Sequence, residues 1–368
     1  MVEEIRRRIE KSIEEDVEET SGEYEVKLRR KPTVKVEERR IERKVIVRKP
    51  KPDKIYISKL SDFVINDALR DNPSIMLFGP PRSGKTTFAY LVANEVSIDN
   101  GFVIYIDSEG NVPWEFNQNV IYIPNHFLPD EPKNRGVVVE DMIDILREAF
   151  TKAFKVGSHE VDLYGLNLTL TYDKSAKTFI AKLGKDVEFP IKKFLLVIDS
   201  LGKLIPIYSG LGKETEESKI RSRLLDRCAH LVTYLYNEFD IPSAFIAIQH
   251  LRSDPMLTTK IIEEARKNPK YRGKSIRSIR DVDIEDRLLL LEPKGESLRY
   301  ILKETWYCEA INVTSDSITF SYWTWRSRFL PNVIEMFRIT LSRGSETAKV
   351  DLKVRGEISL KRRLEVEY

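Results

Sequence analysis

Residues 79 to 86 have the composition and spacing of a phosphate-binding loop (P-loop). Gly79 and Gly84 are separated by four residues, and Lys85 and Thr86 follow directly. Glycines let the backbone curl so that several N–H groups point at one group of phosphate oxygens, and a following helix adds its positive N-terminal dipole. In this pattern the lysine is a cation near the β and γ phosphates, and the threonine hydroxyl ligates Mg²⁺. The residues expected to hold ATP are Gly79, Pro80, Pro81, Arg82, Ser83, Gly84, Lys85, Thr86 and Thr87.

Two carboxylates follow apolar runs and could complete this chemistry. Asp199 closes the run 194–198, and Glu109 comes shortly after the run 102–106. Strand ends of this kind face the ligand crevice of an open α/β sheet, so Asp199 and Thr86 are expected to hold magnesium. Because Ser200 stands where many P-loop ATPases place a glutamate, Glu109 is the candidate for orienting the attacking water. In an open sheet the strand before Glu109 can lie beside the P-loop strand, which would bring Glu109 towards the γ-phosphate. The alternative is a surface glutamate in a turn.

Gln249 is the third residue with a predicted catalytic role, beside Glu109 and Lys85. It ends the apolar run 245–248 and is one of only two glutamines in the chain. A neutral amide at this position could donate a hydrogen bond to the γ-phosphate and transmit its loss to the following loop. A plain strand-end residue is the alternative.

These residues need a sheet that presents them at one edge. Short apolar runs bounded by turn residues predict strands, and longer runs with apolar residues three or four apart predict helices. Strands alternating with helices predict an α/β fold with a doubly wound, mostly parallel sheet and flanking helices. Residues 157–190 are predicted to be an inserted β-hairpin, and 251–335 a long insertion after the fifth core strand. Strands are expected at 74–78, 102–106, 120–123, 194–198, 243–248, 337–341 and 348–354, and helices at 86–96, 138–154 and 217–239.

The ends of the chain differ in composition from the middle. Residues 2–19 carry a narrow helical stripe, and residues 23–54 alternate with period two and hold thirteen basic against six acidic residues. We therefore predict a charged N-terminal extension at 1–54, an ATPase core at 55–355 and a charged tail at 356–368.

Bulk composition excludes several classes of protein. The 368 residues carry a net charge of only +3, which by itself indicates no partner. Cys228 and Cys308 lie far apart without metal-ligand spacing, which favours reduced thiols in a cytoplasmic protein. The N-terminus has no apolar signal region and no apolar run approaches the ~20 residues of a membrane span, so neither secretion nor membrane insertion is expected. The histidines, which form no pair at helical spacing, predict no zinc site; they are His126, His159, His230 and His250.

Four segments resemble the RecA superfamily, and within it the archaeal RadA and RadB recombinases. They are 79–87, 105–110, 196–200 and 208–249. The resemblance implies a RecA-like core with Glu109 as catalytic glutamate and Gln249 as the link between ATP state and DNA binding. It places the two DNA-binding loops at 205–217 and after Gln249. It also implies ATP bound between subunits of an oligomer, with an arginine or lysine supplied in trans.

The segment 265–280 carries seven basic residues and no acidic one, which favours contact with a phosphate backbone. A solvated surface is the alternative, and the aromatic run at 322–328 is either a second contact or core. The leading hypothesis is a DNA-dependent ATPase of the recombinase type that binds single-stranded DNA in its ATP state. The alternatives are a nucleotide-gated recombination mediator with little hydrolysis, or a RecA-like helicase or packaging motor. Predicted DNA contacts are Lys270, Tyr271 (by stacking on a base), Arg272, Lys274, Arg277 and Arg280.

Overall fold

The chain is described by a computed structural model. Its contacts divide it into two units, Met1–Lys49 and Pro50–Tyr368. The first unit lies outside the described residues, and with it the helix and most of the basic segment predicted there. The predicted first DNA-binding loop lies outside them as far as residue 213. The described residues, all in the second unit, are 54–66, 74–129, 132–163, 165–184, 187–204, 214–250, 255–278, 281–290, 304–327, 330, 333–345 and 347–359.

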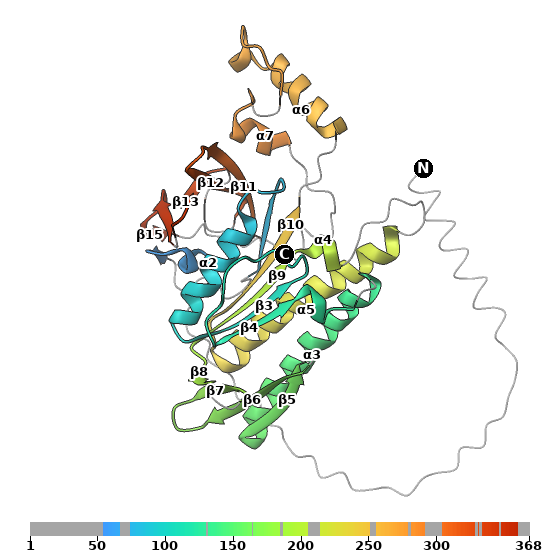
Figure 1. Ribbon diagram of the computed structural model, residues 1–368, viewed down its shortest axis with the longest axis vertical. Coiled ribbons are helices and arrows are strands. Elements are labelled where there is room, and N and C mark those ends of the chain that lie inside the picture. The colour runs from blue at the N-terminus through green and yellow to red at the C-terminus, as the bar shows by residue number, and fades with distance from the viewer. Residues whose placement is uncertain are drawn as a thin grey trace, which may run out of the picture. The chain divides into compact units, whose positions relative to one another are not determined.

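A nine-stranded sheet forms the centre of the second unit (Figure 1). Its order is β14-β13-β12-β11-β2-β10-β9-β3-β4, parallel from β11 to β4 and antiparallel from β11 to β14. This confirms the predicted α/β fold with a large, mostly parallel sheet and flanking helices. The strands are β2 (Ser74–Gly79), β3 (Gly101–Asp107), β4 (Val120–Pro124), β9 (Lys193–Asp199), β10 (Ser243–His250), β11 (Glu304–Val313), β12 (Ser317–Arg326), β13 (Glu335–Ser342) and β14 (Ala348–Leu352).

Helices cover both faces of the parallel strands, which explains why those strands are apolar throughout. On β3, Val103 and Tyr105 pack in the same core cluster as α2 (Lys85–Ile98). The alternate residues of β3 pack in the cluster that contains α3 (Pro132–Val156) and α5 (Glu214–Phe239). Alternation of side chains along each strand therefore divides the core into two layers.

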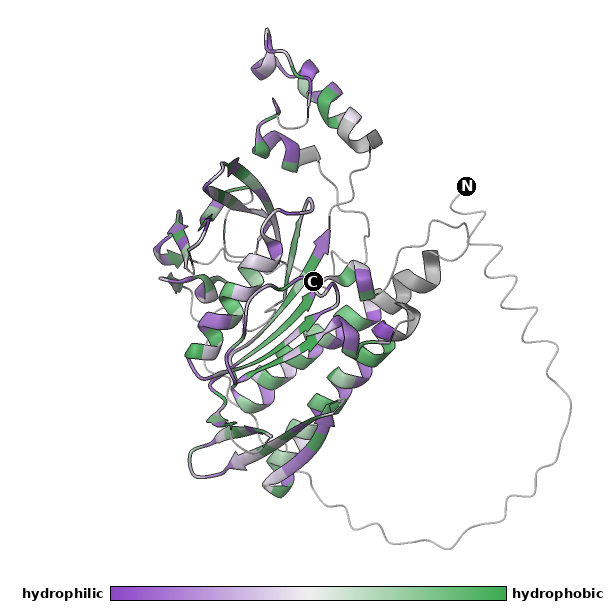
Figure 2. Cartoon of the chain, in the orientation of Figure 1, coloured by the Kyte–Doolittle hydropathy of each residue, from purple (hydrophilic) through white to green (hydrophobic). Residues whose placement is uncertain are grey.

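The helices themselves are mixed in character. Figure 2 shows hydrophilic and hydrophobic residues together on α3 and α5, whereas the central strands are mostly hydrophobic. Within the described part of the chain, none of the helices combines the length and the apolar character needed to cross a bilayer.

The strand order corrects one expectation. The predicted strand 102–106 is present as β3, but it does not lie beside the P-loop strand β2. Two strands, β10 and β9, separate them. The prediction failed because sequence neighbours in a doubly wound sheet need not be neighbours in space. Glu109 must therefore reach the P-loop across the ends of those two strands.

The insertion at 157–190 is larger than the predicted hairpin. It forms a separate four-stranded antiparallel sheet in the order β5-β6-β7-β8. The two middle strands match the predicted hairpin, and the outer two were missed because the alternation of polar and apolar residues in each of them is short. Phe179 packs against Phe150 of α3, so this sheet joins the same core cluster. Its strands are β5 (Ser158–Leu163), β6 (Leu166–Asp173), β7 (Thr178–Leu183) and β8 (Val187–Pro190).

The stretch predicted as one insertion, 251–335, is only partly an excursion from the sheet. Its second part supplies β11 and β12, and β11 pairs in parallel with β2. The prediction was wrong there because β11 and β12 contain polar residues and so lack the continuous apolar run expected of strands in the main sheet. The first part contains short helical elements, namely α6 (Pro255–Lys267), η4 (Pro269–Tyr271) and α7 (Ile284–Leu290).

A small two-stranded sheet joins the start and the end of the second unit. β1 (Lys54–Ile57) pairs antiparallel with β15 (Gly356–Ser359). The core therefore extends past the boundary predicted at residue 355. The remaining short elements are η1 (Leu60–Phe63), η3 (Asn125–Phe127) and α4 (Leu201–Leu204).

An aromatic cluster fastens α2 to the antiparallel strands. Tyr322 of β12 is fully buried, stacks on Phe337 with ring centroids 4.6 Å apart and lies 5.5 Å from the ring of Phe88. Its hydroxyl donates a hydrogen bond of 2.7 Å to the carbonyl of Gly84. The sheet extension thus packs directly against the P-loop.

We expect Tyr322 to stabilise the fold mainly through its ring. Tyr322→Ala leaves a cavity and should lower the free energy of unfolding by about 3–5 kcal/mol. Tyr322→Phe keeps the ring and loses one hydrogen bond, so its cost should be about 1 kcal/mol. Denaturant unfolding measures both, with the exposed Val313→Ala on β11 as control. Equal losses for the two Tyr322 variants would contradict this assignment.

Candidate active site

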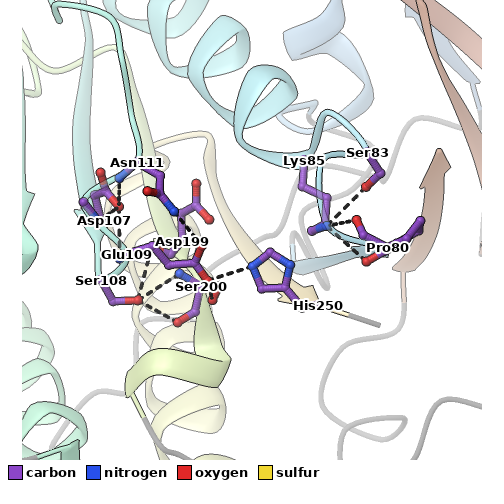
Figure 3. A network of polar contacts seen from close by, with 12 residues as sticks. Pro80, Ser83, Lys85, Asp107, Ser108, Glu109, Asn111, Asp199, Ser200 and His250 are labelled. Atoms are coloured by element: carbon purple, nitrogen blue, oxygen red, sulfur yellow. Dashed lines mark hydrogen bonds and ion pairs between the residues drawn. The ribbon is translucent and has the colours of Figure 1, made fainter. Parts of the chain in front are cut away.

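Lys85 is buried at the start of α2 and bonded to its own loop. The side chain is 3% exposed, and Nζ donates hydrogen bonds to the carbonyls of Gly79 and Pro80 at 3.0 and 2.7 Å and to Ser83 Oγ at 3.2 Å (Figure 3). Burial lowers the pKa of Lys85, and nearby Asp199 and Glu109 act in the opposite direction. The predicted P-loop therefore presents a buried cation.

Glycine is required at both ends of this loop. A Cβ on Gly79 would lie 2.2 Å from the carbonyl oxygen of Cys308 on β11. Gly84 has φ +88°, and a Cβ there would lie 2.5 Å from the ring of Phe320 on β12. Only glycine combines that backbone conformation with so close an approach. The loop is thus confined by β11 and β12 as well as by its own sequence.

Asp199 and Thr86, the predicted magnesium ligands, are in contact. Asp199 is 2% exposed, its Oδ2 accepts a 3.0 Å hydrogen bond from the Tyr105 hydroxyl, and its carboxylate also bonds the Thr86 side chain. The pKa of Asp199 is raised to about 6, with burial as the largest cause. The hydrogen bonds from Thr86 and Tyr105 lower it, and the nearby Asp107 and Glu109 raise it. A divalent cation beside these oxygens would stabilise the ionised form, so the residues fit a Mg²⁺ site.

Asp107 shapes the loop that carries Glu109. Its Oδ1 accepts hydrogen bonds from the backbone N–H groups of Glu109 and Gly110 at 3.1 and 2.8 Å. Its Oδ2 accepts from the backbone of Val112 at 3.1 Å and from the Tyr122 hydroxyl at 2.8 Å. Since these bonds occupy the carboxylate, we assign Asp107 a structural function in the turn after β3.

Glu109 is held by donors from three parts of the chain. Oε1 accepts hydrogen bonds from Ser200 Oγ at 2.5 Å and from His250 Nε2 at 2.7 Å, and Oε2 accepts one from Asn111 Nδ2 at 3.0 Å. These bonds lower the pKa of Glu109 to about 2, with the His250 contact as the largest cause. Ser108 secures the arrangement, because its hydroxyl bonds the backbone on both sides of the Asp199–Ser200 bond (Figure 3).

His250, rather than the predicted Gln249, joins this network. Neighbouring side chains of a strand point to opposite faces, so one residue of this pair can face Glu109 while the other faces away. Gln249 Oε1 is buried and has no hydrogen-bond partner among the described residues. The role of His250 was not predicted, because the spacing of the histidines bears only on metal binding. Its position at the end of a buried strand was the available signal.

The described residues that were predicted to contact DNA differ in their exposure and in their partners. Tyr271 is 2% exposed, packs in a core cluster and donates its hydroxyl to Asp286, so its predicted stacking on a base is wrong. Lys270 forms ion pairs with Asp283 and Asp286. The basic run is partly neutralised by the acidic residues that directly follow it, which its own composition could not show. Arg272, Lys274 and Arg277 are exposed, and Arg280 lies outside the described residues.

The aromatic run after residue 321 is largely core. Tyr322 is fully buried, and Trp325 is 8% exposed and donates its indole N–H to the carbonyl of Leu288. These two side chains are therefore not the DNA-stacking surface considered from the sequence. They anchor the strands to α2 and to α7.

No protein-family model matches this sequence, and no curated protein is significantly similar to it. The geometry of Lys85, Thr86, Glu109 and Asp199 is therefore the basis for functional inference.

We expect the buried Asp199 to make stability depend on pH. Its pKa is higher in the folded chain, about 6, than the ordinary 3.8, so ionisation destabilises the fold as pH rises through that interval. Asp199→Asn removes the charge, so without Mg²⁺ it should be more stable than the wild type by about 1–3 kcal/mol near pH 7. The gain should vanish near about pH 4. Urea unfolding at both pH values measures it, with the exposed Asp316→Asn as control. A gain that is the same at both pH values would contradict the prediction.

Proposed function

We propose that this chain is a Mg²⁺-dependent ATPase with a RecA-like core, similar to the archaeal RadA and RadB recombinases, whose activity depends on single-stranded DNA. One observation supports the proposal above all others. Lys85 and Thr86 follow β2, Asp199 ends β9 and Glu109 follows β3, so the carboxyl ends of these strands bring the four residues together. His250 ends β10, the strand that lies between β2 and β9. A buried cation, two hydroxyl or carboxylate ligands and a fixed carboxylate are the groups that phosphoryl transfer to water requires.

Each residue has a separable task in this proposal. Lys85 and the loop N–H groups bind the phosphates, and Thr86 and Asp199 hold the metal ion. Magnesium, when bound, neutralises charge on the phosphate oxygens. Glu109 orients the attacking water. A carboxylate whose pKa is about 2 is a weak base, so its contribution is orientation rather than proton removal.

The nucleic-acid part of the proposal is carried by fewer residues than the sequence suggested. Arg272, Lys274 and Arg277 are exposed on the segment after α6 and can meet a phosphate backbone. The position of this segment, after the strand that bears His250, supports coupling between DNA and the site. We also propose that the chain forms an oligomer, because the resemblance to the RecA superfamily implies ATP bound between subunits.

A second candidate is a nucleotide-gated binding module with little hydrolysis. The observation that favours it is the engagement of Glu109, which accepts three hydrogen bonds and so has little capacity left for water. Turnover measured with and without single-stranded DNA separates the candidates. Only the ATPase hypothesis predicts clear stimulation.

Lys85→Ala should abolish ATP hydrolysis. Loss of the buried cation removes charge stabilisation at the transferred phosphoryl group, and we expect a decrease of at least about 10²-fold. Phosphate release with ATP and Mg²⁺ measures it. Lys174→Ala, an exposed lysine in the β6–β7 turn, is the matched control and should keep wild-type turnover. Unchanged hydrolysis by Lys85→Ala would refute the site.

Binding of single-stranded DNA should weaken with salt and depend on the exposed cations of the segment 272–277. Lys274→Ala should reduce the slope of log K against log salt by about one, because one phosphate contact is lost. Lys270→Ala should change it less, since Asp283 and Asp286 already pair with Lys270. Fluorescence anisotropy at several salt concentrations tests this. Equal effects of the two variants would argue against the proposed DNA surface.

A further inference from the structure

Three adjacent strand ends meet at the Glu109 carboxylate. β10 lies between β2 and β9, and β9 lies beside β3. In this register His250 pairs with Gly79, the first residue of the P-loop. Asp107 pairs with Asp199, so Glu109 and Ser200 follow the ends of neighbouring strands. His250 is thus situated between the P-loop and the carboxylate, as Figure 3 shows.

The hydrogen bonds on Glu109 leave one acceptor direction open. An ionised carboxylate offers about four lone-pair positions. His250 and Ser200 use the two on Oε1, and Asn111 uses one on Oε2. The direction that remains is determined by these three donors. A water bound there has a defined orientation only as long as they hold the carboxylate in place.

The three donors do not contribute equally to that orientation. Asn111 belongs to the same loop as Glu109 and moves with it. Ser200 is itself bonded through its backbone to Ser108, at the start of that loop. His250 alone comes from a strand next to the P-loop, so it relates the carboxylate to the phosphate-binding residues.

Among the described residues, Glu109 is the hydrogen-bond partner of the His250 ring. Its Nδ1 is buried and has no hydrogen-bond partner among the described residues, so Nε2 is the ring nitrogen that fixes it to the site. A histidine that only filled space in the core would not need a hydrogen bond to this carboxylate.

We propose that His250 is the positioning residue for Glu109, an inference that rests on the proposed ATPase function. It holds the carboxylate at the angle and distance from the P-loop at which Glu109 orients the attacking water. It does so by donating from Nε2 and without contacting the nucleotide. Loss of this bond should therefore affect turnover and leave nucleotide binding unchanged.

The test compares three substitutions at one position in the full-length protein. His250→Ala should lower kcat by about 10²-fold, because misplacing a catalytic group by about 1 Å has effects of that size. KM for ATP and the affinity for a fluorescent ADP analogue should stay within about twofold of the wild type, since uniform binding is untouched. His250→Gln carries an amide N–H that reaches as far along the side chain as Nε2, and should recover most of kcat. His250→Asn reaches only as far as Nδ1 and should not.

A double-mutant cycle with Glu109→Gln identifies the partner. In the Glu109→Gln background, His250→Ala should cause no further decrease in kcat, because the residue it positions no longer has its carboxylate. Thermal unfolding of each variant, with Lys174→Ala as control, reports any general loss of stability. If His250→Ala does not fold, the contrast between His250→Gln and His250→Asn still decides the question.

Each outcome has one meaning. Unchanged kcat in His250→Ala, equal effects of Gln and Asn, or an additive cycle with Glu109→Gln overturns the positioning role while the ATPase function stands. A raised KM with wild-type kcat overturns it too, because His250 would then contact the nucleotide. Absence of turnover by the wild-type protein, with and without DNA, overturns the proposed function and this inference with it.

Discussion

Asp107 and Asp199 are direct neighbours on adjacent parallel strands, so two carboxylates are held together inside the protein. Two ionised carboxylates on paired residues repel each other strongly where water is excluded, so hydrogen-bond donors or a cation must stabilise their charges. Asp107 is compensated by backbone N–H groups and a tyrosine hydroxyl. Asp199 is compensated only in part, by two side-chain hydroxyls, and its pKa is raised to about 6. Because its carboxylate is fully hydrogen-bonded, Asp107 is a structural residue of the turn. Asp199, with fewer donors, is suited to a metal ion.

The same constraint determines where Glu109 lies. Because Asp107 bonds the backbone of the following turn, the glutamate two residues later has little freedom. Ser200 follows Asp199 on the neighbouring strand and meets that glutamate at 2.5 Å. The pairing of two aspartates thus brings a third carboxylate to the ends of β3 and β9. Its hydrogen bonds, the one from His250 above all, then keep this carboxylate ionised against the opposing effect of burial.

The sequence predicted the parallel strands and the residues at their ends because both have strong local signals. The P-loop spacing is specific, Asp199 directly follows a buried run, and Glu109 comes shortly after another. The order of the strands was beyond local signals, since it depends on packing between segments distant in the chain. For the same reason Tyr271 was misjudged: its partner Asp286 lies outside the basic run that drew attention to it. His250 was missed because its hydrogen bond to Glu109 joins residues 141 positions apart.

The segment from α6 to α7 leaves the sheet after His250 and returns to it at Glu304, and these two points flank β2 on opposite sides. Its core residues pack on Phe78, the residue immediately before the P-loop, and Arg287 forms a two-pronged ion pair with Glu309 of β11. A tilt of this segment would therefore act on the P-loop strand through Phe78 and through the neighbouring strand β11. A molecule that binds the exposed arginines between α6 and α7 and shifts this segment would therefore also shift Phe78, directly before the phosphate-binding loop.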